Sequence, residues 1–507
     1  MSDFSYDNFN YDSFNYESLP FPNSHPEKLA SIANLFGIKS KAIQQAKVLE
    51  LGCAAGGNII PIASNYPECS ITGIDLSADQ IKQGQLQIED LGLNNISLET
   101  KSIMDINDND GLFDYIICHG TYSWVPSDVR NKILQICNNN LQKNGVAYVS
   151  YNTLPGWNSV NSVRDMMLFH TQQFPGQQQK ITQARGIIDF ITSALVKDKT
   201  PYADFMRDEI EFIKNKPDSY ILHEYLAENN HPLYFHQFMT LAQENNLSYL
   251  ADAQLHTMFS DNFPDKVSQQ LASVPDIIAT NQYMDYIRNQ RFRSSLLCHA
   301  EAPINRNLQA EDVKNYYLSF IGENKAALSD KDLVEGVSID FDSKNISLQL
   351  KRTVSKLALS ILIELSPSRL HYTALISEIS ERLNMEQALI EQHLNSDINL
   401  MRLVLAGMID INAHPANFTL AITEKPKTTA LVRYQAAKLN RVTNQLHQSI
   451  LISPFEQSLL IQLNGDIHIN DMMNNILAQA DNTLEKPELA ALCQQALLRF
   501  SKHALLI

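Results

Sequence analysis

Short apolar segments alternate with helical segments between residues 46 and 152, and this alternation limits the possible folds more than any other feature of the chain. Five segments have the length and composition of buried strands: 48–51, 70–75, 96–100, 114–119 and 145–151. The stretches between them carry helical patterns, with Ser77 placed to cap one helix. Strands that alternate with helices are typical of βαβ units, so the pattern predicts an α/β fold with a doubly wound parallel sheet.

A helical stretch from Trp157 to about Asn246 follows the fifth strand, and two more strand-like segments come after it, at 247–252 and 295–299. We expect these two to complete a Rossmann-like sheet of seven strands within residues 46–300, with the helices of 157–246 as an insertion. The insertion would leave the sheet at the carboxyl ends of its strands, where ligands bind in open α/β sheets. It is therefore predicted to form a roof over the binding site.

Residues 1–45 are predicted to form an N-terminal arm followed by a short amphipathic helix at 27–36. An imperfect five-residue repeat of Tyr, acid, polar residue, Phe and Asn occupies residues 6–18 and lacks helical periodicity. The repeat predicts a flexible arm. The alternative is that its aromatic side chains fold over a site.

A mainly helical, winged-helix-like domain is predicted for residues 305–423, followed by a helical region at 424–507. The segment 336–350 alternates on either side of a DSKN turn and predicts a hairpin. The other expected elements are helices at 353–365, 372–383 and 386–395, and a wing built from 403–411 and 418–422. Few basic residues accompany this module, so protein contact or packing is expected there rather than DNA binding.

The charge of the chain argues against nucleic acid as a partner. It has 40 Lys and Arg residues and 56 Asp and Glu residues, a net charge of −16, whereas phosphate binding needs clustered basic side chains. No C-x-x-C motif and no Cys/His cluster with zinc spacing occurs, so no metal is expected. The sequence lacks a signal-peptide pattern and any apolar run near the roughly 18 residues of a membrane span. We therefore expect a cytoplasmic protein without membrane insertion.

The strongest functional signal is the segment VLELGCAAGGN at 48–58. A buried strand carries the acid Glu50 and passes through small residues into a helix, so the backbone can approach a ligand and offer free N–H groups. Asp75 ends the second strand 25 residues after Glu50. A carboxylate there can accept hydrogen bonds from both hydroxyls of a ribose. Enzymes that bind NAD or FAD share such a loop, so these signals alone do not separate the classes.

The loop resembles motif I (E/D-x-G-x-G-x-G) of class I S-adenosylmethionine-dependent methyltransferases, with Ala54 in place of the middle glycine. FDYIICH at 113–119 resembles the fourth-strand motif of that class, and LQKNGVAY at 141–148 resembles its turn into strand five. The resemblance implies S-adenosylmethionine as the cofactor, with SIMD at 102–105 at the adenine. The cofactor-binding residues that it implies are Glu50, Gly52, Cys53, Ala54, Gly56, Asn58, Asp75, Leu76, Ser102, Ile103 and His119.

Further segments resemble bacterial methyltransferases that carry a methyltransferase regulatory domain, a family that includes the rickettsial protein-lysine methyltransferases acting on outer membrane protein B. These segments are SHPEKL at 24–29, CHGTYSWVP at 118–126, YNTLPGW at 151–157, YILHEYL at 220–226 and YFHQF at 234–238. The resemblance implies a protein partner whose lysine side chains are N-methylated.

Aromatic and polar side chains that follow strands four and five are candidates for the acceptor site, because such groups can surround a lysine that must lose its charge. We assign this site to Tyr122, Trp124, Tyr151, Asn152 and, from the insertion, His223. Packing is the alternative for three of them. Trp124 can pack a loop, Tyr151 can point into the core, and His223 can be a structural histidine.

Two other functions stay open from the sequence. The segment DYIICHG lacks the [DNS]-P-P-[YFW] pattern of enzymes that methylate amino groups of nucleobases, which leaves proteins and small molecules as acceptors. The chain can therefore also be a small-molecule methyltransferase with regulatory appendages. The other alternative is a non-catalytic protein that senses S-adenosylmethionine, although a sensor would not need an acceptor pocket. Nothing in the sequence indicates an oligomeric state.

Overall fold

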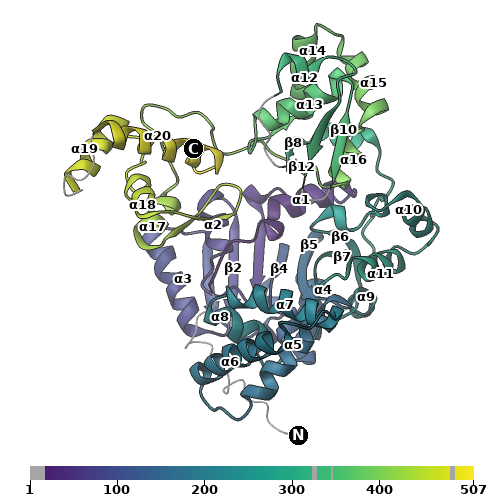
Figure 1. Ribbon diagram of the computed structural model, residues 1–507, viewed down its shortest axis with the longest axis vertical. Helices are drawn as coiled ribbons and strands as arrows, with labels where there is room; N and C mark the ends of the chain where they lie inside the picture. The colour runs from purple at the N-terminus through teal and green to yellow at the C-terminus, as the bar shows by residue number, and fades with distance from the viewer. Residues whose placement is uncertain (1–16, 323–327, 344–345, 480–485) are drawn as a thin grey trace.

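The structure is a computed structural model that describes residues 17–322, 328–343, 346–479 and 486–507 (Figure 1). Its centre is a seven-stranded sheet in the order β3-β2-β1-β4-β5-β7-β6. The strands are β1 Lys47–Leu51, β2 Ser70–Asp75, β3 Ile96–Thr100, β4 Phe113–Cys118, β5 Leu141–Asn152, β6 Leu247–Asp252 and β7 Phe292–His299. Neighbours are parallel except at β7, which runs antiparallel to β5 and β6. The predicted seven-stranded Rossmann-like sheet is confirmed.

Helices cover the sheet, and its central strands are buried as a result. Val48 and Leu49 of β1 and Ile116 and Ile117 of β4 are fully buried, as expected for parallel strands with both faces covered. The helices of this domain are α1 Pro26–Leu35, α2 Ile59–Asn65, α3 Ala78–Leu91, α4 Ser127–Asn139, α9 Phe235–Glu244, α10 Asp265–Ala272 and α11 Ile277–Arg288. The predicted pattern of apolar strands between helices therefore reflects burial.

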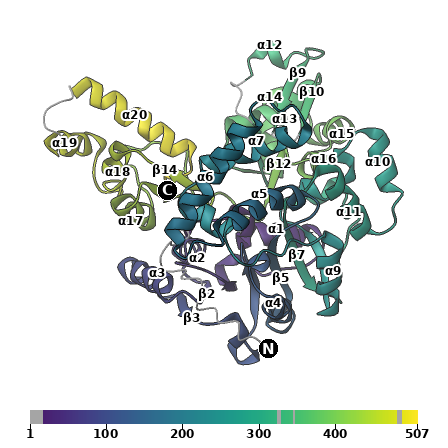
Figure 2. The same cartoon turned by 60° about the horizontal axis from the view of Figure 1, so that its bottom comes forward.

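The helical insertion follows β5 and has a hydrophobic core of its own. Its elements are α5 Gly156–Thr171, α6 Gln177–Leu195, α7 Pro201–Lys214, α8 Asp218–Tyr220 and a π-helix at Ile221–Tyr225. They lie together at the lower end of the sheet in Figure 1 and come forward in Figure 2. The prediction extended this insertion to residue 246, but α9 belongs to the sheet domain because its buried side chains Phe235, Phe238 and Met239 join the core of the sheet.

Residues 313–411 share a second hydrophobic core and contain a three-stranded sheet, β11-β8-β12, and a separate hairpin, β9-β10. The predicted boundaries of this unit, 305 and 423, stay a prediction. The elements are β8 Tyr317–Phe320, β9 Ile339–Asp342, β10 Ser347–Leu350, β11 Leu370–His371, β12 Ile409–Asn412, α12 Asp330–Leu333, α13 Thr353–Glu364, α14 Tyr372–Leu383, α15 Gln387–Asp397 and α16 Leu400–Leu405. The predicted hairpin and helices are present. The predicted wing is wrong, because β12 pairs with β8 and residues 418–422 form no strand. That segment instead contacts the chain end, where Thr419 N donates to Leu506 O at 3.0 Å.

Residues 424–507, called the C-terminal domain below, have a separate hydrophobic core. The elements are α17 Ala430–Lys438, β13 Arg441–Thr443, β14 Ser449–Leu451, α18 Pro454–Leu460, α19 Ile469–Gln479 and α20 Lys486–Lys502. The domain contacts the sheet domain beside α3 (Figure 1), where Lys438 Nζ lies 2.6 Å from Asp90 Oδ2. The β13-β14 hairpin was not predicted, since strands of three residues are too short to show alternation.

Within the ranges given above, no helix is both long and apolar enough to span a membrane. No cluster of His, Cys, Asp or Glu side chains in the same ranges is arranged to hold a metal ion. All six cysteines are buried and unpaired.

Candidate active site

The loop between β1 and α2 has a backbone shape that ordinary residues rarely adopt. Gly52, Ala54 and Gly56 have φ angles of +76°, +51° and +74°. Asp75, at the end of β2, holds this shape: its Oδ2 accepts a hydrogen bond from Ala54 N at 2.8 Å, and its Oδ1 accepts one from Ser77 N at 2.9 Å. The two predicted cofactor-binding elements are therefore joined at the carboxyl edge of the sheet.

Glu50 lies under this loop with 3% of its surface exposed. Its Oε1 accepts a hydrogen bond from Asn58 Nδ2 at 2.7 Å, whereas its Oε2 has no hydrogen-bond partner among the described residues. Burial raises the pKa of the Glu50 carboxyl to about 8, against the lowering effect of the Asn58 hydrogen bond. A buried, unpartnered carboxylate oxygen beside a nucleotide-type loop fits a cationic group such as the amino group of S-adenosylmethionine.

The remaining predicted cofactor residues lie around the ends of β2 and β3. Ser102 caps the short 3-10 helix Ile103–Asp105, because its Oγ accepts a hydrogen bond from Met104 N at 3.2 Å. Ile103 is partly buried against the core, and Leu76, next to Asp75, is half exposed. Two apolar side chains near a carboxylate fit a nucleoside. The buried Cys53 thiol has a raised pKa, which is typical of a packing role.

An extended segment before α1 covers the loop. Gly57 N donates to Ser18 Oγ at 2.8 Å, and Phe21 N donates to Asn58 Oδ1 at 3.0 Å. A Cβ atom at Gly57 would lie 2.2 Å from the carbonyl oxygen of Ser18, so this close approach requires glycine. The described part of the predicted arm, from residue 17, therefore lies over the site. The repeat at 6–16 is outside the described residues.

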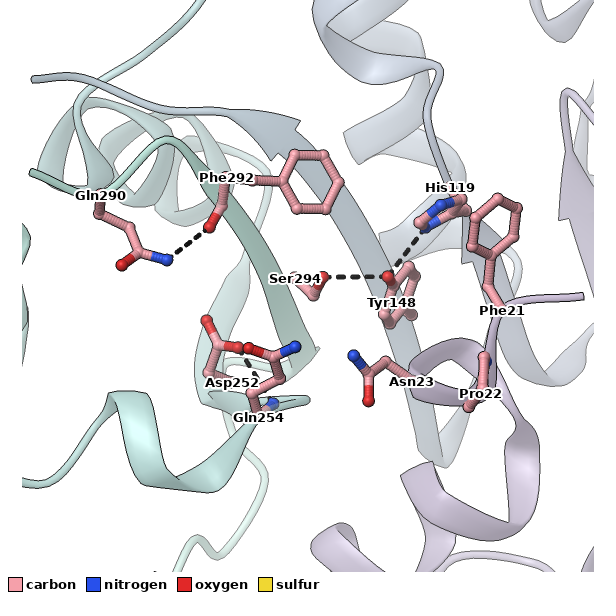
Figure 3. Close-up of a pocket in the computed structure, with 10 residues that line it drawn as sticks. All are labelled: Phe21, Pro22, Asn23, His119, Tyr148, Asp252, Gln254, Gln290, Phe292 and Ser294. Atoms are coloured by element: carbon pink, nitrogen blue, oxygen red, sulfur yellow. Dashed lines mark hydrogen bonds between the residues drawn. The ribbon is translucent and has the colours of Figure 1, made fainter. Parts of the chain in front are cut away.

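A cavity of about 110 Å³ lies between the arm and the later strands of the sheet (Figure 3). The beginning of antiparallel β7 meets the ends of β4 and β6 there. The lining residues are Phe21, Pro22, Asn23, His119, Tyr148, Asp252, Gln254, Gln290, Phe292 and Ser294. The cavity thus combines the rings of two phenylalanines, one tyrosine and one histidine with hydroxyl groups and one carboxylate.

Asp252, the last residue of β6, is 3% exposed and is part of a buried ionic cluster. Arg293 contacts it at 3.4 Å but pairs more closely with Asp285 through two hydrogen bonds of 2.8 Å. Burial raises the pKa of the Asp252 carboxyl to about 6, and Arg293 opposes the rise. Because Asp285 holds most of the guanidinium, Asp252 keeps capacity to accept a hydrogen bond from a cation in the cavity.

His119 lines the cavity and contacts both the arm and β5. Its ring lies against Phe21, with 3.6 Å between ring centroids. Its Nδ1 is 2.9 Å from the Tyr148 hydroxyl, which also donates to Ser294 Oγ at 3.0 Å. Burial lowers the pKa of His119 to about 4, so the ring is neutral at pH 7. His119 is therefore placed to position neighbours as a neutral group.

The structure places the predicted acceptor residues Tyr122 and Tyr151 outside the cavity lining. Both are buried in the core: Tyr151 stacks on Phe238 of α9 with ring centroids 4.1 Å apart, and Tyr122 packs edge-on against the same ring. Tyr148 lines the cavity, and Tyr151 lies an odd number of positions along the same strand, so it points to the other face of the sheet. Tyr151 therefore occupies a position in the core, which was the alternative expected from the sequence.

The other three predicted acceptor residues also lie outside the cavity lining. Trp124 packs edge-on against Trp157 of the insertion, at 6.1 Å between ring centroids. Asn152 Nδ2 donates to Asn230 Oδ1 at 3.0 Å. His223 is part of the π-helix in the insertion. Trp124 and Asn152 thus contact residues of the insertion, and the assignment of all three residues to the acceptor site stays a prediction.

Sequence reasoning missed most of the cavity. The sequence did mark Asp252, because it is an acidic residue at the end of a strand, as Asp75 is. The first residues of β7, including Phe292 and Ser294, face the site only because β7 is antiparallel, and strand direction cannot be read from apolar alternation. Phe21 is a single aromatic residue in a proline-rich segment, and nothing local marks it.

Three family models match the chain. "Methyltransferase domain" matches residues 48–145, "Predicted methyltransferase regulatory domain" matches 217–299, and "PKMT, C-terminal winged helix domain" matches 424–485. The winged-helix model thus falls on the region for which only helices were predicted. The winged-helix-like assignment of 305–423 stays a prediction.

Relatives cover most of the chain. The protein RP789 of Rickettsia prowazekii (strain Madrid E) is 41% identical over 454 residues, which are 88% of this chain and 81% of that protein. The solved structure of PKMT2 from Rickettsia typhi is 35% identical, with a TM-score of 0.87, and the match covers 97% of this chain and 100% of that one. A structure of the same protein in complex with AdoHcy has a TM-score of 0.86. With its cofactor loop and these matches, the chain belongs to the S-adenosylmethionine-dependent methyltransferases that carry a methyltransferase regulatory domain and a PKMT-type winged helix domain.

Proposed function

We propose that the protein transfers methyl groups from S-adenosylmethionine to lysine side chains of a protein acceptor. The proposal rests on the cavity in which Phe21 and Phe292 accompany the buried carboxylate of Asp252 beside His119 (Figure 3). A long side chain with a cationic end fits this chemistry, since its methylene groups would contact the rings and its ammonium would contact the carboxylate. The abbreviation PKMT, for protein-lysine methyltransferase, in the names of the solved relatives and of the winged-helix model supports the acceptor class.

The charge of the acceptor is the main obstacle to this reaction. A lysine has a pKa near 10.4, so forming the neutral amine at pH 7 costs about 4–5 kcal/mol. Burial between aromatic rings disfavours the ammonium and lowers that cost. Asp252, whose pKa burial raises to about 6, first attracts the ammonium and can then accept its proton. The bound cofactor supplies an electrophilic methyl group and a positive charge that disfavours a second cation nearby.

Orientation is the second requirement. His119 and Tyr148 form a fixed polar pair, and Ser294 extends it along β7. Burial lowers the pKa of His119 and raises that of Tyr148, so neither changes its protonation state near pH 7. Because these hydrogen-bonding groups keep their protonation states, they can orient the lone pair of the lysine nitrogen toward the methyl group. Such positioning accounts for a large part of enzymatic rate enhancement.

The decisive experiment is methyl transfer from labelled S-adenosylmethionine to lysine-containing peptides, followed by mass spectrometry that locates the label. We expect whole methyl increments on lysine side chains, and no label on matched peptides in which arginine replaces every lysine. Label confined to small amines or acids, with none on lysine, would overturn the proposal.

The role of Asp252 is tested by Asp252→Asn. We expect kcat/KM for a lysine peptide to fall on the order of a hundredfold, as for the loss of a buried, charged hydrogen bond. Affinity for S-adenosylhomocysteine should stay the same, because Asp252 is not part of the cofactor loop. Asp261→Asn, at an exposed aspartate shortly after β6, is the matched control for a change of charge.

A further inference from the structure

A histidine of the C-terminal domain reaches the cofactor loop. His447 Nε2 lies 2.8 Å from Asn58 Oδ1, and the two residues are 389 positions apart in the chain. Asn58 is the residue from which α2 begins, and it also contacts Glu50 at 2.7 Å. One side chain therefore connects the C-terminal domain to the carboxylate under the cofactor loop.

The hydrogen bonds around Asn58 determine which atom of each side chain donates. Asn58 Oδ1 accepts from the backbone N–H of Phe21 at 3.0 Å, which fixes the orientation of the amide. Its Nδ2 then donates to Glu50 Oε1 and to Ser24 Oγ, the latter at 3.1 Å. His447 therefore carries a hydrogen on Nε2, which it donates to Oδ1. Burial, together with the nearby His25, lowers the pKa of His447 well below its usual range, so the ring is neutral with a single N–H.

The turn that carries His447 is built to hold this ring in place. His447 has a φ of +58°, a conformation that is unfavourable for histidine. Asn444 Oδ1 accepts hydrogen bonds from Leu446 N at 3.0 Å and from Gln448 N at 2.8 Å, and Asn444 Nδ2 donates to His503 O at 2.9 Å. The side chain of His447 is 4% exposed and its ring contacts that of His25, 4.9 Å away between centroids. A strained residue in a rigid turn is thus aimed at the cofactor loop.

A second contact from the same hairpin reaches the arm. Arg441 Nη2 lies 3.0 Å from Glu17 Oε1, and the next residue, Ser18, accepts the hydrogen bond from Gly57 N of the cofactor loop. The C-terminal domain therefore contacts both sides of the loop: the start of α2 through His447, and the covering arm through Arg441.

We propose that His447 is a positioning residue for S-adenosylmethionine, so that the C-terminal domain completes the cofactor site of the sheet domain. His447 holds the amide of Asn58, Asn58 holds Glu50 Oε1, and Glu50 Oε2 is left directed at the amino group of the cofactor. Without the histidine, Asn58 Oδ1 keeps the Phe21 N–H but loses the donor from the C-terminal domain, so the amide is held less firmly against Glu50. The domain matched by the winged-helix model is thereby assigned a role in cofactor affinity that does not depend on the acceptor.

Calorimetric titration of the full chain with S-adenosylhomocysteine tests the proposal. His447→Phe keeps the ring but removes the donor, and we expect it to raise the Kd about tenfold. His447→Gln retains an N–H donor of similar reach and should recover most of the affinity. Lys438→Ala breaks an ion pair in the same domain contact without touching Asn58, and should leave the Kd unchanged. Equal affinities for wild type and His447→Phe, or equal losses for the Phe and Gln variants, would overturn the proposal.

Two further measurements separate positioning from general loss of structure. In an Asn58→Ala background, His447→Phe should cause no additional loss of affinity, because both act through one hydrogen bond.

The wild-type chain supplies a test that needs no folded variant. If His447 favours cofactor binding, cofactor binding must stabilise the His447 turn by the same free energy. Amide hydrogen exchange in residues 441–450 should therefore slow on addition of S-adenosylhomocysteine, and unchanged exchange there would refute the coupling.

Discussion

The backbone N–H of Ala54 donates to Asp75 Oδ2 at 2.8 Å, and this bond ties the cofactor loop after β1 to the end of β2. One carboxylate thus shapes the loop and stands where the ribose hydroxyls are expected. The two signals that the sequence shows as separate are parts of one local structure.

Asp75→Ala should raise the Kd for S-adenosylhomocysteine at least about thirtyfold, corresponding to ~2 kcal/mol. The variant loses the carboxylate that is expected to bind the ribose, and it releases Ala54 N and Ser77 N from their partner. Calorimetry measures the effect, with Asp79→Ala in the exposed first turn of α3 as the control. An unchanged Kd would show that the ribose lies elsewhere.

Ala54→Gly and Gly56→Ala should have opposite effects on stability. Ala54 has a φ of +51°, which costs a residue with a Cβ atom ~1–2 kcal/mol, so glycine should preserve or raise the Tm. At Gly56, which has a φ of +74°, a new Cβ would also lie 3.0 Å from Ile60 and 3.1 Å from Leu98. We expect that variant to lower the Tm by several degrees in scanning calorimetry. A lower Tm for Ala54→Gly would contradict the strain at this loop.

Cofactor binding should release a proton at pH 7. Burial raises the pKa of Glu50 to about 8, so without a cation beside it the carboxyl is mostly protonated at pH 7. A bound amino group favours the carboxylate, lowers this pKa and expels on the order of 0.9 proton. Affinity should therefore rise with pH between about 6 and 8 and level off above pH 9.

Titrations in buffers with different ionisation enthalpies count the protons released on binding. Glu50→Gln cannot ionise at this position and should abolish the release while weakening affinity. Proton uptake on binding, or a release that persists in the variant, would show that Glu50 does not face the amino group.

Tyr122→Phe should leave methyl transfer intact. Tyr122 is fully buried, and its hydroxyl has no hydrogen-bond partner among the described residues. Removing a buried hydroxyl without a partner should change the free energy of unfolding by no more than ~1 kcal/mol, toward greater stability. Tyr151→Phe is the comparison, since it loses a hydrogen bond of 3.1 Å to Ser295 and should be destabilised by ~1 kcal/mol. A tenfold loss of transfer rate in Tyr122→Phe would support the assignment of this residue to the acceptor site.

The cofactor half of the site could be predicted because its signals are local. Glu50, the small residues after it and Asp75 lie at strand ends, and parallel strands bring their carboxyl ends to one edge. The acceptor half could not be predicted in the same way. The residues that line the proposed acceptor cavity come from the arm, from β5 and β6, and from β7, whose antiparallel direction brings Phe292 and Ser294 to that edge. Tyr148 and Tyr151 are two tyrosines of the same strand. Tyr148 lines the cavity and Tyr151 lies in the core, because their side chains point to opposite faces of the sheet.

The sequence by itself determined the sheet, the cofactor loop and the class of cofactor, because burial and chain geometry act on residues that are close in sequence. The tertiary structure alone decided what closes the site. Asn58 accepts hydrogen bonds from Phe21 of the arm and from His447 of the C-terminal domain. Asp252 forms an ion pair with Arg293 of another strand. Each of these contacts joins segments that are far apart in the chain. Such contacts follow from how whole domains pack, and packing leaves no periodic pattern in the residues that it brings together.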